Sequence, residues 1–201
     1  MSLLEEKFTK NRLNGLENLI KVAKKGKKKR VLFLLGYVFD NVMGGELSMF
    51  WRMRTLAKAG FEVTCAYRRD RDHVRKPYDY DEYGVFYDRF SRDIPEKEFV
   101  SLAVSKHKPN IVFNIRDYVK TFVDLFNGSG IYSVCLIEYW TLFVTNPQKF
   151  HEGEFELIHD SIEAMKKHDA VLCNSDFVAK WLRSVGVANP VVCEPLVYPL
   201  E

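Results

Sequence analysis

The stretch Val31–Gly60 constrains the fold of this chain more than any other. It opens with the apolar run VLFLL, which is typical of a strand covered on both faces. A loop follows and closes with Gly44–Gly45, after which apolar residues share one helical face; they are Met49, Phe50, Met53, Leu56 and Ala57. Gly60 ends the helix, and Phe61–Tyr67 has the pattern of a second strand. A strand–helix–strand unit of this kind requires parallel strands, because the helix carries the chain back across the sheet.

The glycine pair lies at the junction between the first strand and its helix. Glycine has no Cβ, so the backbone can turn sharply and a ligand can approach it closely. The helix that follows presents unpaired N–H groups and a partial positive charge, which favour phosphate or another anion. We therefore interpret Gly44, Gly45 and Glu46 as a cofactor-binding turn. The alternative is an ordinary turn and helix cap.

Strands alternate with helices along the rest of the chain. Further strands are predicted at Val85–Phe90, Asn110–Ile115, Ile131–Ile137, Asp169–Cys173 and Pro190–Cys193. Helices are predicted at Glu96–Lys106, Val119–Phe126, Phe155–Met165 and Ser175–Gly186. This alternation predicts an α/β fold with a doubly wound, mainly parallel sheet. We expect one domain over residues 30–201, and in its first later helix we expect Phe99, Leu102 and Ala103 to face inward.

The net charge of +3 is distributed unevenly along the chain. Residues 1–30 contain ten Lys or Arg and three Asp or Glu, whereas the remainder contains twenty against twenty-four. We interpret residues 1–29 as a basic helical arm whose charged end is a solvated lead-in to the first strand. Peripheral contact with an anionic membrane surface through residues 21–30 is the alternative. No nucleic-acid partner is expected, because the body lacks a matching basic patch. The charge-dense segment Arg68–Pro77 is predicted to be a surface loop.

Several classes of protein are disfavoured by what the sequence lacks. No apolar run approaches the roughly 20 residues that span a bilayer, and the N-terminus has no secretory signal, so we expect a cytoplasmic chain. The sequence has no GxGxxG after the first strand and no GxSxG. The five histidines show no metal-ligand spacing, and no metal is expected. His168, at a predicted helix end, is explained by the helix dipole. The four cysteines lie in apolar runs and are interpreted as buried reduced thiols; they are Cys65, Cys135, Cys173 and Cys193.

Polar and aromatic residues gather at the predicted carboxyl ends of the strands, where open parallel sheets bind ligands. The candidate ligand-binding residues are Tyr37, Asn41, Asn114, Arg116, Tyr139, Trp140, Asn174 and Ser175. Glu138 is the candidate catalytic residue, either as a general base or as a group that holds a sugar hydroxyl. The aromatic faces of Tyr139 and Trp140 suit sugar rings. Each has a structural alternative: Glu138 as a capping or ion-paired carboxylate, the two rings as packing, and Asn174–Ser175 chiefly as a helix cap.

Three segments resemble the N-terminal half of a GT-B glycosyltransferase of the retaining family-four type. VLFLLG…GGELSMFWRMRTLAKAGFEVTCAY is similar to that family's first strand, glycine-pair loop, helix and second strand. DAVLCNSDFVAKWLRSVGV resembles its D-x-V-x-x-N-S-x-F strand and helix, and VVCEPLVYP is similar to the strand that leads into the interdomain linker. The match covers roughly Lys29–Pro199.

The resemblance implies a Rossmann-like domain that binds the acceptor, while a separate C-terminal domain binds the nucleotide-sugar donor. That second domain would be a partner of residues 30–201, and this chain alone would be inactive and bind no cofactor tightly. Gly44 and Gly45 would lie against the donor phosphates or the acceptor. Relatives often carry a His where this chain has Glu138–Tyr139–Trp140. The main alternative is a non-catalytic Rossmann-like binding or partner module.

Overall fold

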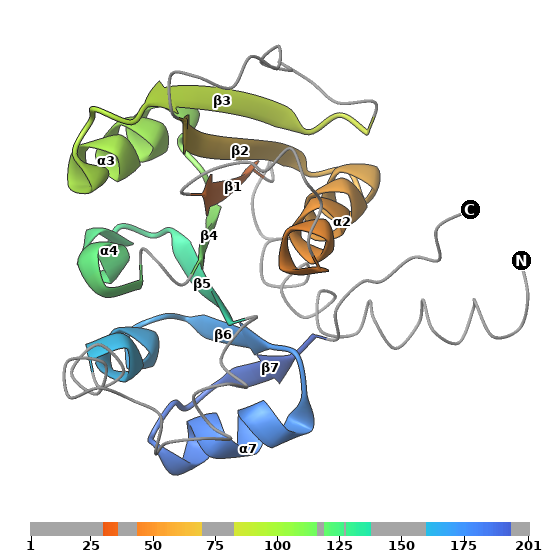
Figure 1. Ribbon diagram of the computed structural model, residues 1–201, viewed down its shortest axis with the longest axis vertical. Coiled ribbons are helices and arrows are strands. Elements are labelled where there is room, and N and C mark those ends of the chain that lie inside the picture. The colour runs from red at the N-terminus through yellow and green to blue at the C-terminus, as the bar shows by residue number, and fades with distance from the viewer. Residues whose placement is uncertain are drawn as a thin grey trace, which may run out of the picture.

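A sheet of seven strands forms the centre of the molecule (Figure 1). A computed structural model of the 201-residue chain describes residues 30–35, 44–69, 83–115, 119–126, 128–137 and 160–193. The strands are β1 (Arg30–Leu35), β2 (Glu62–Arg69), β3 (Phe86–Ser91), β4 (Ile111–Ile115), β5 (Tyr132–Ile137), β6 (Ala170–Cys173) and β7 (Pro190–Val192). Their order is β3-β2-β1-β4-β5-β6-β7, and every neighbouring pair is parallel. The predicted doubly wound α/β fold is confirmed.

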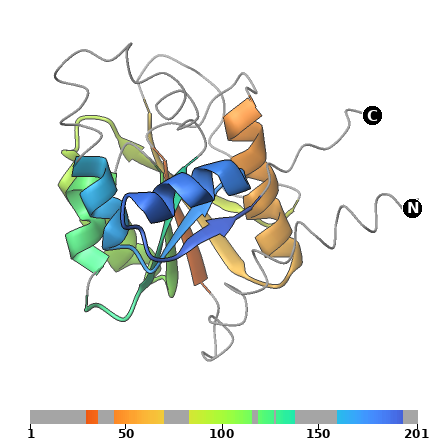
Figure 2. The ribbon, with the colours of Figure 1, turned by 90° about the horizontal axis from the view of Figure 1, so that it is seen from below.

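Helices cover both faces of this sheet (Figures 1 and 2). They are α2 (Gly44–Lys58), α3 (Glu96–His107), α4 (Val119–Phe126), a short helix over 160–166, and α7 (Asp176–Ser184). Among these, α2 packs on one face, and the others pack on the opposite face. This arrangement follows from the order of the strands, because connections that run in opposite directions along a parallel sheet place their helices on opposite faces.

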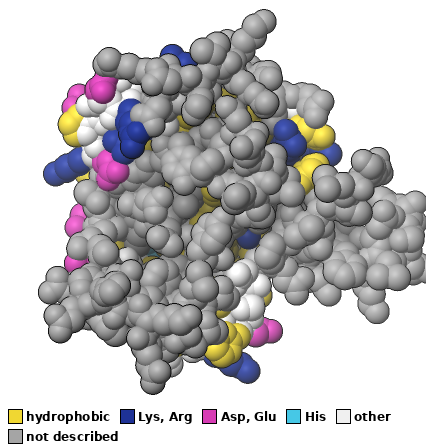
Figure 3. Space-filling view, in the orientation of Figure 1, with side chains coloured by type: hydrophobic (Ala, Val, Ile, Leu, Met, Phe, Trp, Pro, Cys, Tyr) yellow, Lys and Arg dark blue, Asp and Glu magenta, His cyan; other side chains and the backbone are white. Residues whose placement is uncertain are grey.

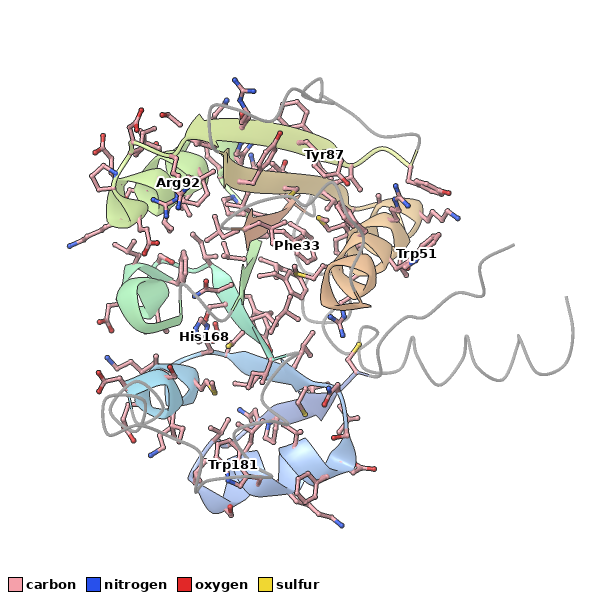
Figure 4. All side chains as sticks on the ribbon, viewed as in Figure 1. Phe33, Trp51, Tyr87, Arg92, His168 and Trp181 are labelled. Carbon is pink, nitrogen blue, oxygen red and sulfur yellow. The ribbon has the colours of Figure 1, made fainter. Side chains whose placement is uncertain are left out.

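The core between α2 and the sheet contains the helical face that the sequence predicts. Met53 and Leu56 are buried there at 0% and 3% exposure, with Met49 and Phe50 partly buried against the same cluster. The strands contribute alternate residues to this core, including Phe33 (Figure 4). The alternation is that of strands covered on both faces, since successive side chains point to opposite sides of the sheet.

The opposite face has two adjoining cores. One joins α3 and α4 to β1 and β4, and includes the fully buried Phe99. The other joins the helix over 160–166 and α7 to β5 and β6, and includes Met165 and Leu182. These helices therefore bury one stripe each, as the apolar spacing of the sequence requires.

Two predicted details are wrong. Leu102 is 43% exposed, because the buried face of α3 passes through Phe99, Val100 and Ala103 and leaves Leu102 on the flank of the helix. Strand β2 continues to Arg69 and includes Arg68, which was assigned to a surface loop. The side chain of Arg68 is only 15% exposed, because it is paired with α3 as described below.

The ends of the chain lie outside the described residues. The predicted helical arm over 1–29 and the closing segment 194–201 therefore remain predictions. Within the described ranges, no helix combines the length and the apolar character needed to cross a membrane.

Candidate functional site

The candidate site is the edge of the sheet at which the strands end. Because all neighbouring strands are parallel, the last residues of β1, β4, β5 and β6 share this edge; they are Leu35, Ile115, Ile137 and Cys173. Strand β1 pairs with β4, and β4 pairs with β5, so the segments that follow these three strands start side by side. The point between β1 and β4, where the strand order reverses, is where open α/β sheets bind ligands.

Helix α2 also begins at this edge. It leads from the end of β1 to the start of β2, so it runs antiparallel to both strands, and its 15 residues span about 22 Å. The predicted residues Gly44, Gly45 and Glu46 form its first turn. The free N–H groups of a helix start are therefore available at the strand-end edge, beside the point where the strand order reverses.

Asn114 is the only predicted ligand-binding residue that the structure describes within the central strands. It lies in β4 between its register partners Leu34 of β1 and Cys135 of β5, and its exposure is 0%. Its side chain points to the α3–α4 face, because Val112, two residues earlier, belongs to that core. In this structure a ligand could touch Asn114 only if neighbouring side chains moved.

Asn174 and Ser175 connect β6 to α7 at the same edge. Ser175 has extended backbone angles, and its Oγ accepts a hydrogen bond of 3.4 Å from the backbone N–H of Val178. The predicted helix cap is therefore confirmed. The thiol of Cys173 donates to the carbonyl oxygen of Ser175 over 3.7 Å, and this contact links the end of β6 to the turn before α7.

The remaining predicted residues lie outside the described part of the chain: Tyr37, Asn41, Arg116, Glu138, Tyr139 and Trp140. The strands that precede them are described, and these strands are neighbours with a common direction. Only the ends of these strands are placed at one edge; the positions and the roles of the six residues remain predictions.

Arg68 lies at the same edge, and the sequence did not predict its pairing with α3. Arg68 donates to the carbonyl oxygen of Ile94 over 3.0 Å and to the carboxylate of Glu96 over 2.8 Å. Its guanidinium lies 5.9 Å from the ring centre of Phe99. These contacts join the end of β2 to the first turn of α3, so Arg68 has a structural role. The charged residues that follow it in the sequence had instead indicated a surface loop.

A carboxylate–histidine pair lies away from this edge, where the end of α3 meets β3. The Oδ2 atom of Asp88 is 2.6 Å from Nε2 of His107 and 2.9 Å from Nζ of Lys106. The side chains of Asp88 and His107 are only 11% and 14% exposed. No sequence signal joins these residues, because Asp88 lies on an edge strand and the other two on the helix that follows it.

His168, which the sequence analysis explains by the helix dipole, is buried and uncharged at neutral pH. His168 is 7% exposed, and neither ring nitrogen has a hydrogen-bond partner. Burial lowers its pKa to about 4, while the negative charge of Asp169 opposes the shift. A neutral ring gains nothing from the negative end of a helix, so the dipole explanation is wrong.

The cysteines match the sequence-based interpretation. All four are free and buried. Burial raises the pKa of the Cys173 thiol to about 11 and also raises the pKa of Cys135. Cys135 and Cys173 are therefore poorly reactive thiols within packed strands. No group of three or more potential metal ligands occurs among the described residues.

Comparison with known proteins identifies the fold. No family model and no curated protein matches the sequence. Among solved structures, sucrose-phosphate synthase from Thermosynechococcus elongatus is similar with a TM-score of 0.63 and 13% identity, over 83% of this chain and 48% of that one. The Glycyrrhiza uralensis protein UGT73P12, solved with glycyrrhetinic acid 3-O-monoglucuronide, is similar with a TM-score of 0.52 and 9% identity, over 82% of this chain and 48% of that one.

The chain thus spans about half the length of the solved chains that it resembles. At this level of identity the likeness establishes the fold alone. The chain has a Rossmann-like α/β fold that is similar to about half of each of these two solved structures.

Proposed function

We propose that this chain is the acceptor-binding domain of a glycosyltransferase that moves a sugar from a nucleotide-sugar donor to a hydroxyl acceptor in glycan or polysaccharide synthesis. The observation that supports this function is the parallel sheet, with its strand-order reversal between β1 and β4 and the start of α2 at the same edge. The fold is similar to part of a sucrose-phosphate synthase, and the sequence motifs are similar to those of the retaining family-four enzymes. A C-terminal GT-B domain would be the partner that holds the donor.

Each residue of the proposed site would have a role in this reaction that suits its chemistry. The N–H groups at Gly44 and Gly45 suit the departing phosphate, because hydrogen-bond donors aimed at developing negative charge stabilise a transition state. Glu46 belongs to the same turn. Glu138, on the segment after β5, would accept a proton from the acceptor hydroxyl or orient it.

The acceptor would be held by the other residues of the strand-end edge. Aromatic faces bind sugar rings through their apolar sides, and amides bind hydroxyl groups. The residues in this role are Tyr37, Asn41, Arg116, Tyr139, Trp140, Asn174 and Ser175, and Asn114 would join them only if the side chains that bury it moved. Peripheral contact with the inner face of a membrane through residues 21–30 would suit a lipid-linked acceptor.

Tryptophan fluorescence with matched variants tests the acceptor role. The chain has three tryptophans, of which Trp140 belongs to the proposed site and Trp181, in α7, does not. Titration with a panel of neutral and phosphorylated monosaccharides and alkyl glycosides should change the fluorescence of the unaltered chain and of Trp181→Phe. The change should be lost in Trp140→Phe.

Three results would contradict this function. A ligand response that persists in Trp140→Phe but disappears in Trp181→Phe would place the binding site elsewhere. Micromolar binding of UDP-glucose to residues 1–201, measured by calorimetry, would show that this chain carries its own donor site. If no sugar binds to this chain and a separate protein chain does bind, the transferase proposal is rejected in favour of a non-catalytic partner module.

A further inference from the structure

A buried arginine joins α2 to the point where the chain leaves the sheet. Arg52, in the middle of α2, is 2% exposed, and its Nη2 atom donates to the carbonyl oxygen of Cys193 over 3.4 Å. The two residues are 141 positions apart in the sequence. Figures 1 and 2 both show the end of β7 beside α2.

Cys193 is held from two sides. Its N–H donates to the carbonyl oxygen of Cys173 over 2.8 Å, which continues the ladder between β6 and β7, and its carbonyl accepts from Arg52. The side chain of Cys193 is 2% exposed and belongs to the core beneath α2. This residue therefore depends on the sheet for one hydrogen bond and on the helix for the other.

The bond from Arg52 adds a contact with α2 to a short strand whose backbone is otherwise paired on one side only, with β6. This strand has three residues and lies at the edge of the sheet, and Val191 and Val192 are only partly buried. Short edge elements open locally at a small cost in free energy. A guanidinium keeps its charge at every accessible pH, so once buried it strongly favours a retained hydrogen-bond acceptor.

We propose that Arg52 is a latch that fixes the exit of the chain at Cys193 to helix α2. When the latch opens, the end of β7 separates while the rest of the sheet stays closed. Because α2 is the helix that starts at Gly44–Gly45, the end of β7 is coupled to the element that carries the candidate anion site. This latch does not depend on the proposed transferase function, and its test requires no substrate.

The buried cysteines provide a readout within the chain itself. Cys193 lies at the latch, and Cys65 lies in β2, in the same core, at 0% exposure. Alkylation with iodoacetamide, followed residue by residue by mass spectrometry, reports the opening that exposes each thiol. The ratio of the Cys193 rate to the Cys65 rate compares local opening at the latch with opening of the rest of the sheet, and urea denaturation of each variant measures its global stability.

Three variants give the expected results. Arg52→Met fills a similar volume without a donor, and it should raise the Cys193-to-Cys65 ratio by about tenfold, the factor for losing one hydrogen bond from a charged group. Arg54→Met is the matched control on the same helix, since Arg54 lies over the ring of Tyr83 at 4.4 Å and should leave the ratio unchanged. Arg52→Lys should raise the Cys193-to-Cys65 ratio by about threefold, because the lysine ammonium has a different reach and geometry from the planar guanidinium of arginine.

The latch is refuted if Arg52→Met changes both labelling rates by the same factor, because Arg52 would then support only the global fold. It is also refuted if Arg54→Met raises the ratio as much as Arg52→Met does. If Arg52→Met fails to fold, Arg52→Lys alone tests the latch. A Cys193-to-Cys65 ratio equal to that of the unaltered chain would then reject it.

Discussion

The rings of Phe33 and Phe113 are stacked with their centres 4.4 Å apart and their planes 1° from parallel. The two residues are direct register partners on β1 and β4, the strands between which the order of the sheet reverses. Both side chains are buried in the core under α2, at 0% and 1% exposure. The stack therefore fixes the two strands whose ends flank the candidate site.

Truncation of this stack should lower stability more than truncation at any exposed aromatic position. Phe113→Ala should reduce the free energy of unfolding by about 3–5 kcal/mol, because it removes a fully buried ring and leaves a cavity beside Phe33. Urea denaturation followed by circular dichroism measures the loss. Phe177→Ala is the control: Phe177 is 57% exposed on α7, where hydrophobic atoms reach the surface in Figure 3, and its loss should cost about 0.5 kcal/mol or less. Equal costs for the two variants would contradict the role of the stack.

The sequence predicts the described strands and helices closely, for a physical reason. A parallel sheet covered on both faces requires continuous apolar runs, and its helices require apolar stripes, so both leave distinct periods in the sequence. The run Val31–Leu35 and the helical face with Met53 and Leu56 are examples, and both are buried as expected. The direction of the strands follows from the alternation of elements, which is why the edge at which the strands end could be predicted.

The contacts that join distant segments could not be predicted. The pairs Arg68–Glu96 and Arg52–Cys193 depend on which strands become neighbours, and no local pattern encodes this. The exposure of Leu102 has a similar cause, because the packing of α3 against the sheet selects one of two adjacent apolar stripes. Within the candidate site, the cap at Ser175 was predictable because capping is local.

The carboxylate of Asp88 should contribute measurably to stability. Asp88→Asn keeps the shape of the side chain but removes the charge that faces His107 at 2.6 Å and Lys106 at 2.9 Å. Because the site is largely buried, we expect the free energy of unfolding at pH 6 to fall by about 1–3 kcal/mol in urea denaturation.

An exposed ion pair provides the comparison for Asp88. Glu163 lies 2.6 Å from Lys166, and their side chains are 49% and 34% exposed. Glu163→Gln should cost about 0.5 kcal/mol or less, since solvent screens such pairs. A cost for Asp88→Asn no larger than this would show that the buried cluster adds nothing to the attachment of α3 to β3.

Removal of the cap of α7 should loosen the turn that follows β6. Ser175→Ala deletes the oxygen that accepts from the N–H of Val178, and it should lower the free energy of unfolding by about 1 kcal/mol. Ser175→Asp should retain stability, because a carboxylate caps equally well. Ser184→Ala, which removes an exposed hydroxyl at the other end of α7, should change thermal stability little. If Ser175→Asp is as unstable as Ser175→Ala, the serine acts through something other than capping.

His168 should make the stability of the domain depend on pH. The ring of His168, labelled in Figure 4, is buried, and neither nitrogen has a hydrogen-bond partner. Burial lowers its pKa from the ordinary value of 6.5 to about 4 in the folded chain. Between these two values the unfolded chain binds the proton and the folded chain does not. The contribution of His168 to the free energy of unfolding is therefore fully present above pH 6.5 and is lost as the pH decreases toward 4. The loss is at most about 3 kcal/mol, and it ends once the folded chain also binds the proton.

The variant His168→Leu separates this contribution from those of the other titratable groups. It keeps an apolar side chain in the site and removes the proton-binding ring, so its stability should decline less than that of the unaltered chain between pH 7 and pH 4. Urea denaturation at half-unit pH intervals gives both curves, and groups common to both proteins cancel in their difference. Parallel curves would mean that His168 finds a proton acceptor when charged or that the ring becomes solvated, and either result would contradict the unpartnered buried imidazole.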